Sequence, residues 1–180
     1  MHNRLSILLE VVTLWLNINP EDKMPLTRIS IIAAIIFLID RITKWLVVEW
    51  LDLAARFKIE VAPPFLNFVM AWNEGVNFGL FGDSGEFTRY FLIVLAMVIV
   101  IGLGFWARNK SGWKIPIFTG LIIGGALGNV LDRFIYGAVA DFLNMSCCGI
   151  NNPYAFNIAD VAIFAGAFGL ILFGDTKNRL

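Results

Sequence analysis

The strongest constraint on this chain comes from long apolar segments that carry no charge. Residues 90–107 and residues 115–131 contain no Asp, Glu, Lys or Arg. Residues 161–174 form a shorter apolar segment, which reaches a spanning length if its helix begins at Asn157. A helix needs about 20 mainly apolar residues to cross a bilayer, so these three segments are predicted to be transmembrane helices.

A fourth apolar segment, residues 29–48, is interrupted by Asp40, Arg41 and Lys44 near one end. We interpret it as a further span. The chain is therefore predicted to be an all-α polytopic membrane protein with four transmembrane helices, at about 29–48, 90–107, 115–132 and 157–174. The composition agrees, because 58% of the 180 residues are hydrophobic and 16% are charged, against roughly 25% charged in a typical soluble domain. A soluble fold of this size could not bury so much apolar surface.

Small residues predict how these helices pack. Gly120, Gly124 and Gly128 recur every four residues, and the last span repeats the spacing in Ala162/Gly166 and Ala165/Gly169. Small residues at this spacing allow membrane helices to approach closely.

Basic residues predict the orientation of the spans. They flank the apolar segments at Lys23, Arg28, Arg108, Lys110, Lys114, Lys177 and Arg179. With four spans these positions share one side, which the positive-inside rule assigns to the cytoplasm together with both termini. The segments at about 49–86 and 132–156 then lie outside. Residues 61–81 are rich in apolar and β-prone types, so a small extracytoplasmic sheet is predicted between the first two spans.

Residues 1–23 form a separate N-terminal extension to the predicted four-span domain, residues 24–180. Its apolar part, residues 5–16, is broken by Glu10 and is too short to span. We interpret it as an extension without a catalytic role, and the alternative is a short amphipathic helix on the membrane surface. Lys plus Arg and Asp plus Glu balance at 14 each, so no basic excess indicates nucleic acid, and none is expected as a partner.

Polar residues gather at the predicted outer ends of the spans, where ionisable groups are costly and usually paired or functional. They are Asp40, Lys44, Asn73, Asn77, Asn129, Asp132, Arg133, Asp141, Asn157 and Asp160. Asp40 and Lys44 have the spacing of a helical ion pair, which we interpret as structural.

The other polar residues differ in what they predict. Asn129, Asp132 and Arg133 are expected to support the site from a helix end. Asn157 and Asp160 could be only an N-cap and a first-turn acid. Asp141 lies among apolar neighbours, which favour its protonated form. An acid in such surroundings is expected either to be paired with another polar group or to take part in the chemistry.

The possible chemistry is narrowed by what the sequence lacks. His2 is the only histidine, so neither a histidine-activated nucleophile nor a zinc-binding H-E-x-x-H motif is expected. A Ser–Lys arrangement stays open through Ser84 or Ser146 with Lys44. Two aspartates that share a proton remain, and such a pair can activate water for peptide hydrolysis without metal or cofactor.

Five motifs occur in order along residues 24–174. They are Asp40-Arg-Ile-Thr-Lys44, Trp72-Asn-Glu-Gly75 with Phe78-Gly79, Gly124-Gly-Ala-Leu-Gly-Asn129 continuing to Asp132-Arg133, Val139-Ala-Asp141-Phe142, and Phe156-Asn157-Ile-Ala-Asp160. Together they resemble the lipoprotein signal peptidases of the bacterial inner membrane. Ala140 replaces a valine that the family often has, and Glu74 and Asn77 stand where smaller or less polar residues are common.

The resemblance implies a catalytic dyad of Asp141 and Asp160, which cleaves a lipid-modified prolipoprotein just before its diacylglyceryl-cysteine. It also implies supporting or substrate-binding roles for Asn73, Gly125, Asn129, Asp132, Arg133 and Asn157, and a supporting pair of Asp40 and Lys44. The expected partners are this substrate and membrane lipid. One chain holds the full motif set, so it is expected to act as a monomer. A small transporter or proton channel and a membrane scaffold are the alternative functions.

Overall fold

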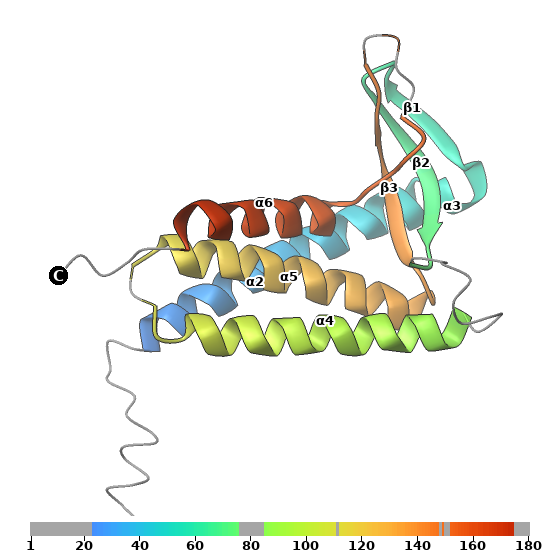
Figure 1. Ribbon diagram of the computed structural model, residues 1–180. Coiled ribbons are helices and arrows are strands. Elements are labelled where there is room, and N and C mark those ends of the chain that lie inside the picture. Colours follow the sequence, from blue (N-terminus) through green and yellow to red (C-terminus); the bar gives the residue numbers. More distant parts are fainter. Residues whose placement is uncertain (1–22, 76–84, 111, 148, 150–151, 175–180) are drawn as a thin grey trace, which may run out of the picture.

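The computed structural model describes residues 23–75, 85–110, 112–147, 149 and 152–174. Figure 1 shows long helices lying side by side, with a small sheet at one end of them. The helices are α2 (Lys23–Lys44), the π-helical turn η2 (Trp45–Trp50), α3 (Leu53–Arg56), α4 (Gly85–Ala107), α5 (Lys114–Ile135) and α6 (Ile158–Phe173). The strands are β1 (Lys58–Ala62), β2 (Leu66–Asn73) and β3 (Val139–Met145).

The long helices coincide with the four predicted spans, with shifted ends. α4 begins before the predicted residue 90, and α2 begins before the predicted residue 29. α2 also continues as α-helix past Asp40 and Arg41, where Arg41 forms an ion pair with Asp132 of α5. Within the described ranges, α4 from Glu86 and α5 are long and apolar enough to cross a membrane, and α6 is a shorter apolar helix.

α5 is the central helix, and its glycines explain its close packing. A Cβ at Gly124 would lie 2.5 Å from the carbonyl oxygen of Ala33 on α2, and one at Gly125 would lie 2.5 Å from that of Ala159 on α6. In the last helix, a Cβ at Gly166 would lie 2.6 Å from the carbonyl oxygen of Phe118. The predicted close approach through small residues is confirmed at Gly124 and Gly166.

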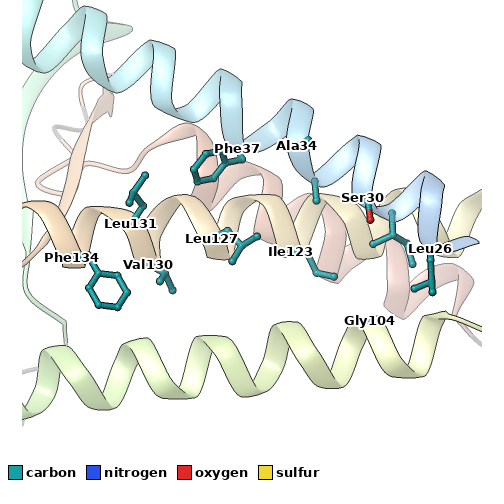
Figure 2. Close-up of a pocket in the computed structure, with 12 residues that line it drawn as sticks. Leu26, Ser30, Ala34, Phe37, Gly104, Ile123, Leu127, Val130, Leu131 and Phe134 are labelled. Atoms are coloured by element: carbon teal, nitrogen blue, oxygen red, sulfur yellow. The ribbon is translucent and has the colours of Figure 1, made fainter.

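α4 is much less buried than α5. Only 11% of its apolar segment is buried within the protein, compared with 67% for α5. An apolar groove of about 650 Å³ separates it from α2, with α5 as the floor. Figure 2 shows Phe37, Leu127 and Phe134 lying between the ribbons of α2 and α4. We call this space the α2–α4 groove.

The sheet is antiparallel in the order β1-β2-β3. The predicted β structure between the first two long helices is confirmed by β1 and β2. However, β3 comes from the segment between α5 and α6, so the all-α description and the confinement of the sheet to one segment were wrong. The burial of β3 is nearly continuous rather than alternating, which removes the period-2 pattern by which a strand is recognised.

A second apolar core fixes the sheet against the end of the bundle. Phe142 of β3 packs with Val47 of η2 and Leu53 of α3. β3 is therefore held from both sides, by β2 through its ladder and by this core through its side chains. The strand that carries Asp141 is consequently fixed to both the sheet and the helices. The N-terminal extension, apart from Lys23, lies outside the described residues.

Candidate active site

Asp141 is held on β3 by two amide side chains. Its carboxylate accepts hydrogen bonds from Asn73 Nδ2 at 3.0 Å and from Asn157 Nδ2 at 2.6 Å. Asn73 ends β2 opposite Val139, so the antiparallel ladder brings its amide to the acid. Asp141 is buried, with only 4% of its surface exposed.

Asp160 lies in the first turn of α6, and two residues hold its carboxylate. Asp160 Oδ2 accepts the backbone N–H of Asn157 at 3.2 Å, while Asn157 Oδ1 accepts the backbone N–H of Asp160 at 2.9 Å. This reciprocal pair is a capping box at the helix N-terminus. Asp160 Oδ1 accepts a further bond from Asn129 Nδ2 at 2.9 Å. The predicted N-cap role of Asn157 is therefore confirmed, and it leaves Oδ1 of Asp160 directed toward α5.

Asn157 connects the two acids through one buried side chain. Its oxygen caps the helix that carries Asp160, and its nitrogen donates to Asp141. The same nitrogen lies 3.2 Å from Asn129 Oδ1. Asn157 is fully buried. The two carboxylates predicted as a pair are thus brought together from a strand and a helix by one amide.

The surroundings of Asp141 favour its protonated form. Burial raises the pKa of Asp141 from its ordinary value of 3.8 to about 6, and the negative charge of Asp160 adds to the rise in pKa. Hydrogen bonds from Asn73 and Asn157, with the positive charge of Lys44, act in the opposite direction. Desolvation is the largest cause, as the apolar neighbours of Asp141 in the sequence predict.

Arg133 and Asn129 lie one turn apart on α5 and line a second groove. Arg133 Nη1 donates to the carbonyl oxygen of Asn129 at 3.2 Å. Its buried Nε has no hydrogen-bond partner among the described residues. The groove has a volume of about 240 Å³ and is otherwise lined by apolar residues of α4, α5 and α6. We call it the α4–α6 groove. Its lining includes Asn129, which donates a hydrogen bond to Asp160.

The predicted ion pair of Asp40 and Lys44 is confirmed, with Nζ and Oδ2 2.9 Å apart. It belongs to a larger buried cluster that includes Asp132, whose Oδ2 lies 2.6 Å from Lys44 Nζ. Arg41 contacts both acids. Sequence analysis assigned Arg41 no role, although its place inside the Asp40–Lys44 motif was a signal. The cluster joins α2 to α5 and accepts the backbone N–H groups of Ala140 and Ala159, the residues just before the two candidate acids.

The remaining predicted residues have less direct positions. Gly125 contacts the start of α6 rather than an open site. Glu74 is exposed, while Asn77 and Ser84 lie outside the described residues. Ser146 accepts a hydrogen bond from the backbone of Asn152 and Lys44 is engaged by Asp40 and Asp132, so no Ser–Lys pair forms with Ser146. In the described part of the chain, no three His, Cys, Asp or Glu side chains cluster to hold a metal ion.

The structure combines apolar helices of spanning length with two carboxylates held through one amide. Two close carboxylates can share a proton and activate water, so the fold and the site indicate a membrane aspartic hydrolase. Comparison with known proteins identifies the family. A sequence model described as signal peptidase (SPase) II matches residues 32–174. The chain belongs to the signal peptidase II family, and it is an aspartic endopeptidase. This decides against the transporter and scaffold alternatives.

Individual relatives agree with the family. A lipoprotein signal peptidase of Methylobacterium radiotolerans is 43% identical over 146 residues, covering 81% of this chain and 84% of that protein. A lipoprotein signal peptidase of Rhodopseudomonas palustris is 38% identical over 148 residues, covering 80% of this chain and 90% of that protein. A solved structure described as a bacterial membrane enzyme has a TM-score of 0.67 at 27% identity, covering 81% of this chain and 92% of that one.

Proposed function

We propose that this chain cleaves the signal peptide from diacylglyceryl-modified prolipoproteins, just before the lipidated cysteine, with Asp141 and Asp160 as its catalytic dyad. The observation that carries the proposal is the position of Asn157, which binds Asp141 through its nitrogen and Asp160 through its oxygen. An asparagine used only as a helix cap would need no buried carboxyl on its other side.

The two acids take different parts in the proposed reaction. Asp160, at a helix N-terminus that favours its anion, removes a proton from the attacking water. Asp141 carries the other proton and donates it to the carbonyl oxygen as the tetrahedral intermediate forms. The amine then leaves with the proton that Asp160 gained, while one hydroxyl of the intermediate returns its proton to Asp141, so that the peptide bond is broken and both acids regain their starting states. Asn129 holds Asp160, while Asn73 and Asn157 hold Asp141.

The α4–α6 groove is the proposed site of the substrate's signal segment. Its walls are apolar, which suits a hydrophobic signal helix, and its polar residues are Asn129 and Arg133. A scissile bond near Asn129 would lie beside Asp160. Arg133 lines this groove and is the proposed hydrogen-bond donor to the substrate's carbonyl oxygen. The diacylglyceryl chains would stay in the surrounding lipid.

We also propose that α2, α4, α5 and α6 all span the inner membrane, with both termini in the cytoplasm and the dyad near the outer face. Residues 24–180 form the peptidase domain in this proposal, and residues 1–23 take no part in catalysis. One chain contributes every residue assigned to the dyad and its supports, so the protein acts as a monomer with its substrate and membrane lipid.

Single-turnover cleavage of a lipidated prolipoprotein tests the dyad. Asp141→Asn and Asp160→Asn are nearly isosteric changes, and each is expected to abolish turnover in folded protein. The double variant should be no worse than either single variant, because the two acids act as one unit. Asp52→Asn is the matched control, since Asp52 is an exposed acid outside the long helices. Substantial turnover in either folded single variant would remove that aspartate from the dyad.

A further inference from the structure

Lys44 is an unusual residue, a buried cation whose three N–H donors are all directed to separate acceptors. Only 2% of its side chain is exposed. Its Nζ lies 2.9 Å from Asp40 Oδ2, 2.6 Å from Asp132 Oδ2 and 3.2 Å from Asn129 Oδ1. A lysine ammonium has three donors, so this nitrogen has none left over.

Each of these three acceptors leads to one member of the dyad. Asp40 Oδ1 accepts the backbone N–H of Ala159 at 3.2 Å, and Ala159 directly precedes Asp160. Asp132 Oδ2 accepts the backbone N–H of Ala140 at 3.2 Å, and Ala140 directly precedes Asp141. The third acceptor, Asn129, donates to Asp160 itself at 2.9 Å. One nitrogen is therefore connected to the main chain of both β3 and α6.

A purely stabilising role does not account for this arrangement. Buried ion pairs contribute little net stability, since desolvation offsets their attraction, and apolar replacements are often as stable. A pair holding α2 against α5 would also need no bond to the backbone at Ala140 or Ala159. Both alanines are fully buried, and their N–H groups are fixed by carboxylates that share one ammonium.

We infer that Lys44 is a positioning residue for the reaction, which sets the separation of Asp141 and Asp160 by holding Asp132 against β3 and Asp40 against α6. The inference rests on the proposed dyad. Lys44 does not line the α4–α6 groove, so its loss changes the alignment of the acids and leaves substrate binding intact. Loss of Lys44 should therefore lower kcat and leave KM unchanged.

The test is a charge-balanced pair of substitutions, Lys44→Met with Asp132→Asn. One charge of each sign is removed, and the new amide oxygen can still accept the N–H of Ala140. We expect a folded protein whose KM is unchanged and whose kcat falls about 10²-fold, the size expected for a displacement of about 1 Å in a catalytic group. The matched control is Lys58→Met with Glu60→Gln, which removes an exposed ion pair of 2.8 Å on β1 and should change neither constant.

Several outcomes would overturn the inference. One is wild-type kcat in the folded Lys44/Asp132 variant; another is a loss confined to KM or proportional to the unfolded fraction. If this variant does not fold, Lys44→Arg replaces it, because arginine keeps the charge but cannot direct three donors from one nitrogen. Wild-type kcat in Lys44→Arg, or failure of both proteins to fold, would assign Lys44 to stability alone. Turnover by Asp141→Asn or Asp160→Asn would instead refute the dyad, so the two failures are distinguishable.

Discussion

At the scale of single residues, the chemistry of this protein depends on amides as much as on acids. Asn73, Asn129 and Asn157 each donate to a carboxylate of the candidate pair. An amide donates without adding a charge, so it can orient an acid without forming an ion pair with it. This allows Asp141 to keep a raised pKa while its position remains fixed.

The raised pKa of Asp141 predicts how stability depends on pH. In the native protein this carboxyl keeps its proton until about pH 6, and with the ordinary pKa of 3.8 it loses the proton earlier in the unfolded chain. The native state therefore binds more protons within this window, and stability falls as pH rises through it. Asp141→Asn should gain Tm relative to the wild type between these two pH values. A constant difference in Tm would contradict the assignment.

The buried contacts of Asp40 predict that removing its carboxylate destabilises the protein. Asp40→Ala leaves Lys44 and Arg41 with one carboxylate instead of two and removes the acceptor for Ala159. Breaking a buried charge pair costs about 3–5 kcal/mol, so the Tm or the amount of inserted protein should fall clearly. Glu60→Ala is the control because it removes an acid from an exposed ion pair with Lys58, whose loss costs little. Full stability with complete loss of cleavage would place Asp40 in the chemistry itself.

At the scale of elements, helices could be predicted better than strands. Uncharged apolar runs identify α4 and α5 because composition alone marks a segment that lipid can surround. β3 could not be predicted in the same way, since it is covered by β2 on one side and by a small core around Phe142 on the other. The contact between Asn73 and Asp141 depends on the register of that strand, which no local pattern encodes.

The acids of the site were easier to identify than their geometry. Asp141 was recognisable as a charge among apolar residues, and Asn157 with Asp160 had the spacing of a cap. What could not be predicted is that one asparagine is bonded to both acids, or that Arg41 and Asp132 enlarge the Asp40–Lys44 pair. These contacts join residues far apart in the chain.

Gly125 provides a prediction at this scale. A Cβ there would lie 2.5 Å from the carbonyl oxygen of Ala159, just before Asp160. Gly125→Ala should therefore displace the start of α6, with a cost of about 1–3 kcal/mol for overpacking and a lower kcat. Gly102→Ala on α4 is the control, since nothing lies within 4 Å of its added Cβ. Equal Tm and turnover in the two variants would show that the α5–α6 contact accommodates the added Cβ without loss of stability or activity.

At the scale of the whole molecule, the placement of Lys and Arg predicts its orientation. Reporter fusions after Lys110 and after Lys177 should give a cytoplasmic signal, and fusions at Glu60 and at Asn151 an extracytoplasmic one. Such an arrangement places the sheet and the two acids on the side to which prolipoproteins are exported. A cytoplasmic signal at Asn151 would put the dyad on the wrong side for its proposed substrate.

The low burial of α4 has a further consequence for the whole enzyme. This helix separates two hollows, the α2–α4 groove on one side and the α4–α6 groove on the other. A sideways movement of α4 toward α2 would reduce the α2–α4 groove and enlarge the α4–α6 groove, which would make room for the substrate's signal segment. Spin labels on α2 and α4 would report this exchange as a shorter separation when substrate is bound, and an unchanged separation would mean that α4 acts as a fixed wall.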